Sequence, residues 1–448
     1  MLLSELTHDL PVTITHDPDI THLTCDSRTA TPNSLFFDIT GQYGKDSKAA
    51  YVIDPTHCDN IQNVIGDIAK RFYQHSYNIN AYPKLIGITG TNGKTSVAHF
   101  VRELLTKSGK KAASIGTLGV IGANIEKAGT ATHTLTTPDI LYLHETLAQL
   151  AAQHYDYVAL EVSSHGLHQQ RIAGLTCEVA ALTNITQDHL DYHGTMQEYV
   201  AAKQLLFTNY LMGKAIVHDS CKKYATGTYY QLQGLKTNHH GIAFEYDGKT
   251  IQTQLMGAFQ AENIVCALHI CEALGIDQST LLQHATTLTP VRGRMEKIAT
   301  HNDATILVDY AHTPDALATI LQHLRPHITN AGRLMVVFGA GGDRDKTKRP
   351  LMGEIAAQYA DFAIITDDNP RTEDANLIRD EIAQKCPTCL NIEDRATAIT
   401  HALSLLQPHD ILVIAGKGHE EIQVIGTEAL PYSDTQVVLD YCNTKQTA

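Results

Sequence analysis

The stretch KLIGITGTNGKTS, residues 84–96, is the part of the sequence that decides the fold. Its apolar residues Leu85, Ile86 and Ile88 predict a short buried strand. The segment that follows, VAHFVRELLTKSG, predicts a helix that ends near Gly109. A strand, a glycine turn and a helix in this order are typical of a phosphate-binding loop, which we call the phosphate cradle.

The turn between this strand and this helix carries the chemistry. Gly90 and Gly93 let backbone N–H groups face an anion, and Lys94 adds a mobile positive charge at the helix N-terminus. Thr95 supplies a hydroxyl for a magnesium ion. The spacing departs from G-x-x-x-x-G-K-[ST], which needs a glycine where Ile88 stands. A glycine turn without a ligand is the alternative, and the Lys-Thr pair between strand and helix argues against it.

Length and composition bound the class of protein. The 448 residues are enough for two to four domains, and 43% hydrophobic with 18% charged residues is typical of a globular protein. No apolar run approaches 18 residues and the first residues, MLLSELTHDL, lack a basic region with a long apolar core, so we expect neither a membrane span nor a signal peptide. The net charge of −14 argues against nucleic-acid binding.

Nine cysteines are scattered along the chain, and this usage suits a reducing cytoplasm. The closest pair is Cys386 and Cys389 in the run CPTC. A CxxC can be a redox motif or half of a zinc site, but no second CxxC is present. We therefore predict structural thiols and a cytoplasmic protein.

The chain divides into three predicted domains at residues 1–82, 83–293 and 294–448. Tyr82-Pro83 marks the first border. Beyond it, strands alternate with helices twice over, which predicts mostly parallel sheets with helices on both faces. The predicted fold class is α/β: a small α/β N-terminal domain, a central P-loop-type mononucleotide-binding domain, and a C-terminal Rossmann-like domain.

Two further residues follow apolar strands of the central domain. Glu161 is the last residue of the predicted strand YDYVALE. His189 is the last residue of a second predicted strand, CEVAALTNITQDH. Ligands bind at the carboxyl ends of strands in such sheets, so we expect Lys94, Glu161 and His189 to share a site.

Lys203 is out of place in its predicted helix, residues 195–209. It lies on the apolar stripe, three residues after Val200 and four after Tyr199. A lysine there either snorkels to the edge of the core or turns into an active-site cleft. The spacing leaves both alternatives open.

The run GAGG at residues 339–342 invites a dinucleotide-binding interpretation. The third glycine of G-x-G-x-x-G would fall on Arg344, so we reject NAD binding. The serine of EVSSHGL, Ser163 or Ser164, is not in a G-x-S-x-G elbow, and His165 is too close in sequence to be a typical hydrolase partner.

The order of the motifs resembles one family along nearly the whole chain, the Mur ligases. These ATP-dependent amide-bond ligases build the peptide stem of peptidoglycan. Singly the motifs are weak and together they are very specific; in order they are GITGTNGKTS, TTPD, EVSSHGL, NITQDHLDYHG, AAKQLLF, GRME, VDYAHTPDAL, FGAGGDRDKTKRP, TDDNPRTED and AGKGHE. The resemblance is strongest to the members that add the third residue of the stem. DNPR at residues 368–371 is the pattern of those that add meso-diaminopimelate.

This resemblance implies a reaction and its ligands. ATP phosphorylates the side-chain carboxylate of D-glutamate in UDP-MurNAc-L-Ala-D-Glu, and the amine of meso-diaminopimelate attacks the acyl phosphate. Charge develops on phosphoryl and carbonyl oxygens in both steps, so Mg²⁺ and fixed cations are needed. We also expect a monomer, with no nucleic-acid partner and no membrane span.

The resemblance also assigns roles to individual residues. The catalytic set is Lys94, Lys203, His189 and Glu161, with magnesium held by Thr95, Glu161, His189 and a carbamoylated Lys203. Contacts to ATP are implied for Gly90, Thr91, Asn92, Gly93, Lys94, Thr95, Ser96, Asn263, Arg294 and Asp309. Contacts to the UDP-linked substrate are implied for Ser27, Thr136, Thr137, Ser163, Gln169 and Arg171. The diaminopimelate pocket would comprise Arg344, Asp368, Asn369, Pro370, Arg371, Gly416 and Glu420, because arginine binds carboxylates bidentately.

Two departures from the family pattern keep alternatives open. The N-terminal domain is short and lacks an Asp-Gly-His-like segment, which bears on uridine binding, and Gln260 stands where the family has asparagine. The alternatives are a lysine-adding member, a ligase with another acceptor such as a folylpolyglutamate synthase, or a catalytically silent nucleotide-binding relative. Intact Lys94, Glu161, His189 and Lys203 argue against the last.

Overall fold

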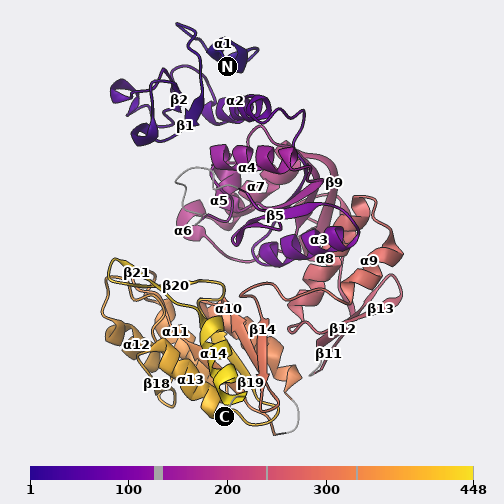
Figure 1. The fold of residues 1–448 in the computed structure, drawn as a ribbon. Helices are drawn as coiled ribbons and strands as arrows, with labels where there is room; N and C mark the ends of the chain where they lie inside the picture. Colours follow the sequence, from indigo (N-terminus) through magenta and orange to yellow (C-terminus); the bar gives the residue numbers. More distant parts are fainter. Residues whose placement is uncertain (126–134, 239–240, 329–330, 447–448) are drawn as a thin grey trace. The chain divides into compact units, whose positions relative to one another are not determined.

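The computed structural model describes residues 1–125, 135–238, 241–328 and 331–446. They form two compact units, one of Met1–Gln231 with Asn263–His284 and the other of Leu232–Glu262 with Ala285–Ala448 (Figure 1). Within the described residues no helix is long and apolar enough to cross a membrane. The division into three domains at residues 82/83 and 293/294 stays a prediction.

The first unit begins with a small parallel sheet. Its order is β1-β2-β3 and its elements are α1 (Leu3–Thr7), β1 (His22–Thr24), η1 (Ser27–Thr29), β2 (Ser34–Phe37), η2 (Gly44–Asp46), β3 (Tyr51–Ile53) and α2 (Ile61–Ser76). Asn60 caps α2 by accepting from the backbone N–H of Asn63. Helix α2 packs on α4 (Ile140–Ala152), and Ile140, Leu141 and Ala148 belong to the same apolar core as β2 and β3.

A seven-stranded sheet forms the centre of the first unit, in the order β10-β9-β8-β4-β7-β5-β6. All its strand pairs are parallel except β5 with β6. The strands are β4 (Lys84–Thr89), β5 (Ala112–Gly116), β6 (Gly119–Ile121), β7 (Tyr157–Glu161), β8 (Cys177–Leu182), β9 (Leu211–His218) and β10 (Thr228–Tyr230). The other elements are α3 (Lys94–Lys107), α5 (Ser164–His168), α6 (Leu190–His193), α7 (Met196–Leu205), η3 (Leu206–Tyr210) and η4 (Asp219–Cys221). Helix α8 (Phe259–Ala273) belongs to this unit from Asn263 onward, and α9 (Gln278–Ala285) belongs to it up to His284.

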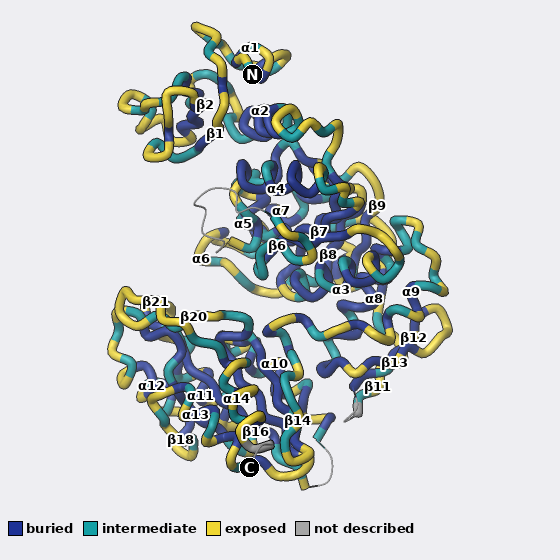
Figure 2. The backbone as a smooth tube through the Cα atoms, in the orientation of Figure 1, coloured by how far each residue is buried: buried dark blue, intermediate teal, exposed yellow. Residues whose placement is uncertain are grey.

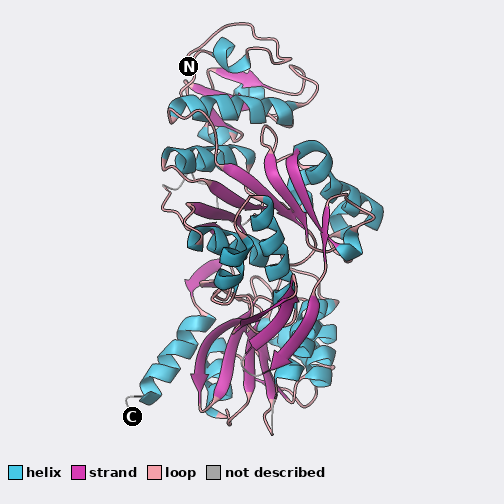
Figure 3. Ribbon diagram, turned by 90° about the vertical axis from the view of Figure 1, so that its right-hand side faces the viewer, coloured by secondary structure: helices cyan, strands magenta, loops and turns pink. Residues whose placement is uncertain are grey.

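Alternation along the strands explains why helices cover this sheet. Leu85 of β4 packs with Leu143, Leu147 and Leu150 of α4 in one core. Its neighbour Ile86 is also buried but belongs to no part of that core, as expected where successive side chains point to opposite faces. Buried backbone runs through the strands in Figure 2, and helices flank them in Figure 3. The predicted α/β class is therefore confirmed.

The second unit holds a small antiparallel sheet and a six-stranded sheet. The first, β11-β12-β13, comprises β11 (Gln233–Asn238), β12 (Gly241–Tyr246) and β13 (Lys249–Thr253), with a hairpin turn at Asp247-Gly248. The second, β14-β15-β19-β16-β17-β18, is parallel except at the edge pair β14 with β15. Its strands are β14 (Glu296–His301), β15 (Ala304–Asp309), β16 (Leu334–Phe338), β17 (Phe362–Ile365), β18 (Leu390–Asn391) and β19 (Ile411–Ala415), and β20 (Ile422–Ile425) pairs with β21 (Glu428–Pro431).

Helices lie on both faces of the six-stranded sheet. Val336 and Val413 pack with α10 (Pro314–Leu324), α11 (Lys348–Tyr359) and α12 (Ala375–Ala383). The next residues along the same strands, Val337 and Ile414, pack with α13 (Arg395–Ser404) and α14 (Asp434–Gln446). A short η5 (Arg325–His327) follows α10. This alternation is what buries a parallel sheet on both sides.

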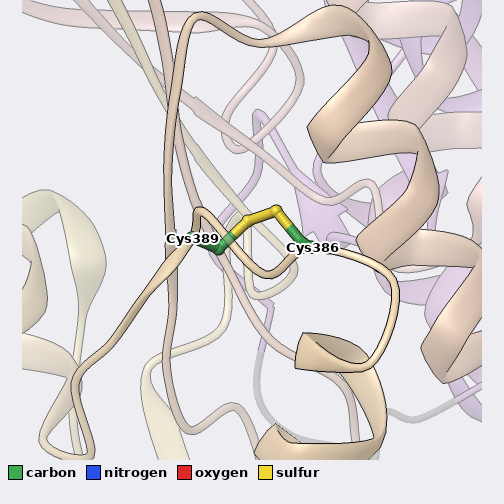
Figure 4. Close-up of a disulfide and its surroundings, with 2 residues drawn as sticks. All are labelled: Cys386 and Cys389. Atoms are coloured by element: carbon green, nitrogen blue, oxygen red, sulfur yellow. A yellow bond between two sulfur atoms is a disulfide. The ribbon is translucent and has the colours of Figure 1, made fainter.

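Two predictions need correction. Strand β8 ends at Leu182, well before Asp188-His189, because the chain leaves the sheet in an irregular segment that contacts the glycine turn. Cys386 and Cys389 are joined in a disulfide rather than held as thiols (Figure 4). A turn with Cys389 N donating to Cys386 O brings their Cα atoms to 5.4 Å, within reach of a disulfide.

Candidate active site

The glycine turn at the end of β4 adopts backbone conformations that side chains resist. Gly90 has φ +146° and Gly93 has φ +88°. A Cβ on Gly90 would collide with Thr183 Oγ1, and one on Gly93 would lie 2.5 Å from Asn263 Oδ1. Helix α3 begins directly afterwards at Lys94, so its N-terminal N–H groups face the turn. The structure therefore places Asn263 of α8 against the predicted cradle.

The segment after β8 holds this turn in place. Thr91 N donates to Asn184 O and Asn92 N donates to Asn184 Oδ1, both at 2.9 Å. Thr183 Oγ1 donates to Asn92 O at 2.6 Å. The segment after β8 thus fixes the turn on one side, and the N-terminus of α3 is the end of the helix that can bind an anion.

Two lysines converge on the same carbonyl. Lys94 Nζ donates to Gly90 O at 2.9 Å and to Thr91 O at 2.8 Å. Lys203 Nζ donates to Gly90 O at 2.8 Å, and its side chain is buried. The snorkelling alternative for Lys203 is therefore wrong. Burial, and next the charge of Lys94, lower the pKa of Lys203 well below its usual value.

Oxygen ligands gather beside the lysines. Thr95 Oγ1 donates to Glu161 Oε2 at 2.8 Å, and Thr117 donates to both Glu161 oxygens, N to Oε1 at 3.0 Å and Oγ1 to Oε2 at 3.2 Å. The parallel register pairs Ile88 with Glu161, which brings this carboxylate to the edge of the glycine turn. A buried carboxylate next to a hydroxyl is a donor set that suits Mg²⁺.

His189 lies at the start of α6, beyond the end of β8. It is the N-cap of α6 with φ +52°, its side chain is 47% exposed, and its Nε2 lies 3.4 Å from Asp188 Oδ2. Its ring packs on His165 at 4.7 Å and on Tyr199 at 6.3 Å. In the described part of the chain no group of three or more His, Cys, Asp or Glu side chains is arranged to hold a metal. Among the described residues, Thr95 and Glu161 are therefore hydrogen-bonded to each other, but the predicted magnesium ligands do not form a complete coordination set.

Tyr199 links these parts, a role that its sequence position did not reveal. Its hydroxyl lies 2.9 Å from Thr91 Oγ1, and its ring lies 4.6 Å from Lys203 Nζ. The residue is fully buried, and burial raises its pKa to about 12. The apolar stripe predicted its burial, but only the fold shows that it connects the glycine turn to Lys203.

The residues predicted to contact the UDP-linked substrate form one network, apart from Ser27. Ser163 N donates to Thr137 Oγ1 at 2.8 Å, and Arg171 Nη1 donates to Thr137 O at 2.8 Å. Arg171 Nη2 donates to Gln169 Oε1 at 2.6 Å. Thr136 joins through Thr117, with the two hydroxyls 3.2 Å apart. Ser27 begins the short helix η1 in the N-terminal sheet region, and no described hydrogen bond connects it to this network.

The second unit carries the remaining predicted nucleotide contacts. Asp309, at the end of β15, accepts from Met295 N and Ala311 N at 2.7 Å each. Burial raises the pKa of its carboxyl group, which Arg294 partly offsets. The Arg294 guanidinium lies 4.6 Å from the ring centre of Tyr310. Gln260 donates to Arg294 O at 3.5 Å, so this departure from the family pattern lies beside Arg294.

The DNPR residues meet the loop after β19. Asn369 Nδ2 donates to Glu420 Oε2 at 2.9 Å. Asp368 is 8% exposed, its Oδ2 has no hydrogen-bond partner among the described residues, and it faces Gly416 so closely that a Cβ there would lie 2.5 Å away. A buried carboxylate oxygen without a donor suits a ligand ammonium group.

The two predicted arginines approach the same glycine-rich loop. Arg371 has φ +52° and donates through Nη1 to Gly342 O at 2.7 Å. Arg344 is exposed, and its Cγ and Arg371 Nη1 both lie within 4 Å of the Cβ position of Gly341. Pro370 adjoins the same loop, since a Cβ on Gly342 would clash with its carbonyl oxygen. The structure thus brings together the whole set predicted for the amino acid.

Comparison with known proteins identifies the family. Residues 88–271 match the Mur ligase middle domain, and residues 293–418 match the Mur ligase, glutamate ligase domain. A UDP-N-acetylmuramoyl-L-alanyl-D-glutamate–2,6-diaminopimelate ligase of Agrobacterium fabrum is 39% identical over 94% of this chain and 92% of its own length. The protein of the same name from Caulobacter vibrioides is 38% identical over 94% of this chain and 95% of its own.

A solved structure gives the same result. The structure of a UDP-N-acetylmuramoyl-L-alanyl-D-glutamate–2,6-diaminopimelate ligase is 30% identical, covers 100% of this chain and 99% of its own, and aligns with a TM-score of 0.70. These matches span the glycine turn, the Lys203 helix and the DNPR loop. The chain therefore belongs to the Mur ligase family.

Proposed function

We propose that this chain is an ATP-dependent ligase that joins meso-diaminopimelate to the D-glutamate of UDP-MurNAc-L-Ala-D-Glu. The observation that carries the proposal is the buried Asp368 Oδ2, which has no hydrogen-bond partner among the described residues and adjoins Asn369, whose amide donates to Glu420. Relatives at 36–41% identity bear the name of this activity. Diaminopimelate carries two ammonium and two carboxylate groups, which matches a pocket of paired acids and arginines.

The first step forms an acyl phosphate. The D-glutamate side-chain carboxylate attacks the γ-phosphorus of ATP, the bond to the β-phosphate oxygen breaks, and ADP leaves. Lys94 and the N–H groups of Gly93 to Ser96 would hold the β- and γ-phosphates, since they face the glycine turn. Mg²⁺, held by Thr95, Glu161, His189 and carbamoylated Lys203, would neutralise charge on the phosphoryl oxygens.

The second step forms the amide. The diaminopimelate amine attacks the acyl carbon, phosphate leaves with the bonding electron pair, and the amine loses a proton. Thr136, Thr137, Ser163, Gln169 and Arg171 would hold the muramoyl-dipeptide, because they form one hydrogen-bonded network beside Glu161. Fixing both reactants in a near-attack geometry can lower the barrier by about 7–11 kcal/mol.

Lys203 would act as a carbamate. Its amine attacks CO₂ and loses a proton, which leaves an anionic ligand in place of a cation. A buried lysine that shares one carbonyl with Lys94 supports this, because two ammonium groups so placed repel each other. Carbamoylation would replace that repulsion with attraction to Lys94 and to a metal.

A phosphate-release assay with an amino-acid panel tests the proposal. UDP-MurNAc-L-Ala-D-Glu, ATP and Mg²⁺ are mixed with meso-diaminopimelate, L-lysine or no amino acid. We expect rapid release with diaminopimelate and little with L-lysine, which lacks the second carboxylate. Good turnover with lysine alone would overturn the specificity, and no heat of binding for the UDP-linked substrate at millimolar concentration would favour a ligase with another acceptor.

We further propose that the active protein is a cytoplasmic monomer. ATP and UDP-linked precursors are the reactants of the proposed reaction, and both of its proposed sites are built from residues of one chain. Light scattering at micromolar concentration should give the mass of one 49.1 kDa chain. Twice that mass at working concentration would contradict the monomer.

A further inference from the structure

Lys417 is a buried cation that the proposed mechanism does not use. It lies in the loop after β19, and its side chain is 0% exposed. Its Nζ donates to Asn369 Oδ1 at 2.9 Å and lies 3.1 Å from Glu420 Oε2. Lysine is almost never fully buried unless it is paired, so both contacts are required to keep it there.

These contacts fix which way the Asn369 amide faces. Its Oδ1 accepts from Lys417 Nζ and from Val424 N, both at 2.9 Å. A flipped amide would point its NH₂ group at two donors, so the observed orientation is the one that satisfies every atom. Asn369 Nδ2 must therefore point toward Glu420, where it donates at 2.9 Å. Among the described residues, the second N–H of that amide and Glu420 Oε1 have no hydrogen-bond partner.

The resulting pair is complementary to the head of an amino acid. An amide N–H donor can bind a carboxylate, and a carboxylate oxygen can bind an ammonium group. Asp368 directly precedes Asn369 in the sequence. Its Oδ2 has no hydrogen-bond partner among the described residues and faces Gly416. Lys417 contacts both members of the pair and, being fully enclosed by protein, is not itself exposed to a ligand.

We propose that Lys417 is a positioning residue that sets the donor of Asn369 and the acceptor of Glu420 for the zwitterionic end of the amino-acid substrate. This inference rests on the proposed function, because it concerns the amino-acid pocket of that reaction. Lys417 acts through its two neighbours rather than by contact with the substrate. It also holds the Glu420 carboxylate beside the Asn369 amide, since Glu420 Oε2 contacts both Lys417 Nζ and Asn369 Nδ2.

The test compares Michaelis constants for three substrates in Lys417→Met. Loss of a hydrogen bond to a charged group should raise the KM for diaminopimelate about 10- to 100-fold. The KM values for ATP and the UDP-linked substrate should stay within about twofold, since those sites are formed by other residues. Lys385→Met, which removes an exposed lysine of the same unit, is the matched control and should resemble the wild type. Equal changes in all three constants would overturn the proposal.

A second variant covers the case in which Lys417→Met does not fold. Lys417→Gln keeps one N–H donor for Asn369 without the charge, and its KM for diaminopimelate should fall between those of wild type and Lys417→Met. Circular dichroism and thermal unfolding verify that each variant is folded. A Lys417→Gln enzyme that is folded and has the wild-type KM would contradict a positioning role.

A double-mutant cycle separates positioning from a purely structural role. Glu420→Gln keeps the side-chain size and removes the charge on which Lys417 acts. If Lys417 works through Glu420, adding Lys417→Met to Glu420→Gln should raise the KM for diaminopimelate no more than about threefold further. Fully multiplicative effects would show that Lys417 acts independently and would overturn the proposal.

Failure of this inference is distinguishable from failure of the proposed function. Wild-type turnover with diaminopimelate and an unchanged KM in the variants would overturn the role of Lys417 alone. Wild-type turnover with a different amino acid would overturn the proposed specificity. The KM comparison is then made with that amino acid, whose head has the same carboxylate and ammonium groups.

Discussion

Lys94 and Lys203, 109 positions apart in the sequence, donate to the same oxygen, the backbone carbonyl of Gly90, at 2.9 and 2.8 Å. One lysine begins a helix at the phosphate cradle, and the other comes from the buried face of α7. Two cations so close in a buried place are costly unless one of them loses its charge. This relationship gives Lys203 a chemical task that packing alone does not require.

Replacing Lys203 tests its proposed role as a carbamoylated metal ligand. Lys203→Ala should lower kcat by at least about a thousandfold, because the proposed anionic ligand for the metal would be lost. Short-chain carboxylates such as acetate or propionate should restore part of the activity if the lysine is carbamoylated. Lys84→Ala, at an exposed position of β4, is the control and should keep its activity without responding to carboxylates. A Lys203→Ala enzyme with near wild-type kcat would contradict the assignment.

The glycine turn gives a prediction about nucleotide affinity. In Gly90→Ala the added Cβ collides with Thr183 Oγ1 at a backbone angle, φ +146°, that alanine resists. We expect at least about tenfold weaker ATP binding by calorimetry, together with lower stability. Gly109→Ala is the matched control, because its φ is also positive, at +77°, but no atom lies within 4 Å of the new Cβ. It should cost roughly 1 kcal/mol of stability and leave ATP affinity unchanged.

His144 predicts how the stability of the first unit depends on pH. It is fully buried in α4, where Nε2 donates to Ala173 O at 2.9 Å and Nδ1 lies 3.1 Å from the Tyr82 hydroxyl. Burial lowers its pKa from 6.5 to about 4, so the unfolded chain binds this proton more readily than the folded one. Stability from this group is therefore present above pH 6.5 and is lost as the pH falls toward 4, by roughly 3 kcal/mol in all.

Urea unfolding between pH 7 and pH 4 measures this effect. His144→Gln removes the titrating group and keeps a side chain that can bond to Ala173 O. Its stability should be lower than the wild type at pH 7 but should fall less steeply with acid. Equal slopes for the two proteins across that range would contradict the assignment.

Arg395 and Asp434 form a fully buried ion pair in the second unit. Their side chains are 0% exposed, with Arg395 Nε to Asp434 Oδ1 at 2.7 Å and Nη2 to Oδ2 at 2.8 Å. Arg395 also donates to Ala415 O at 3.0 Å, at the end of β19. Arg395→Met leaves the aspartate without its partner and should destabilise this unit by roughly 3–5 kcal/mol.

The control for this pair is exposed. The side chains of Arg325 and Asp361 are 44% and 41% exposed, and Arg325 Nη1 lies 2.7 Å from Asp361 Oδ2. Arg325→Met should lower the free energy of unfolding by about 1 kcal/mol or less. Thermal unfolding of both variants measures the two losses of stability. Similar losses for the two substitutions would show that burial does not set the strength of the Arg395–Asp434 pair.

The strand–turn–helix order and the alternation of elements could be predicted from the sequence because they depend on local patterns. The strand before Gly90 and the strand that ends at Glu161 both appear in the structure where expected. Their signals lie within a few residues of one another, and period-2 burial requires no tertiary information.

What the sequence could not settle depends on long-range packing. Lys203 fitted two alternatives equally, and only the position of Gly90 O decides between them. The extent of β8 was overestimated because an apolar run does not show where the chain leaves the sheet. Tyr199 and Lys417 looked like ordinary stripe and loop residues, since their partners lie far away in the sequence. The Cys386–Cys389 disulfide depends on a turn geometry that spacing does not specify.

The mass of the product tests the central claim most directly. Purified protein is incubated with UDP-MurNAc-L-Ala-D-Glu, ATP, Mg²⁺ and meso-diaminopimelate, and the UDP-linked species are analysed by mass spectrometry together with ADP and phosphate. The account predicts that the substrate gains the mass of one diaminopimelate less one water, with one ADP and one phosphate released per product. ATP hydrolysis without that mass gain, or the same gain from L-lysine in preference to diaminopimelate, would contradict it.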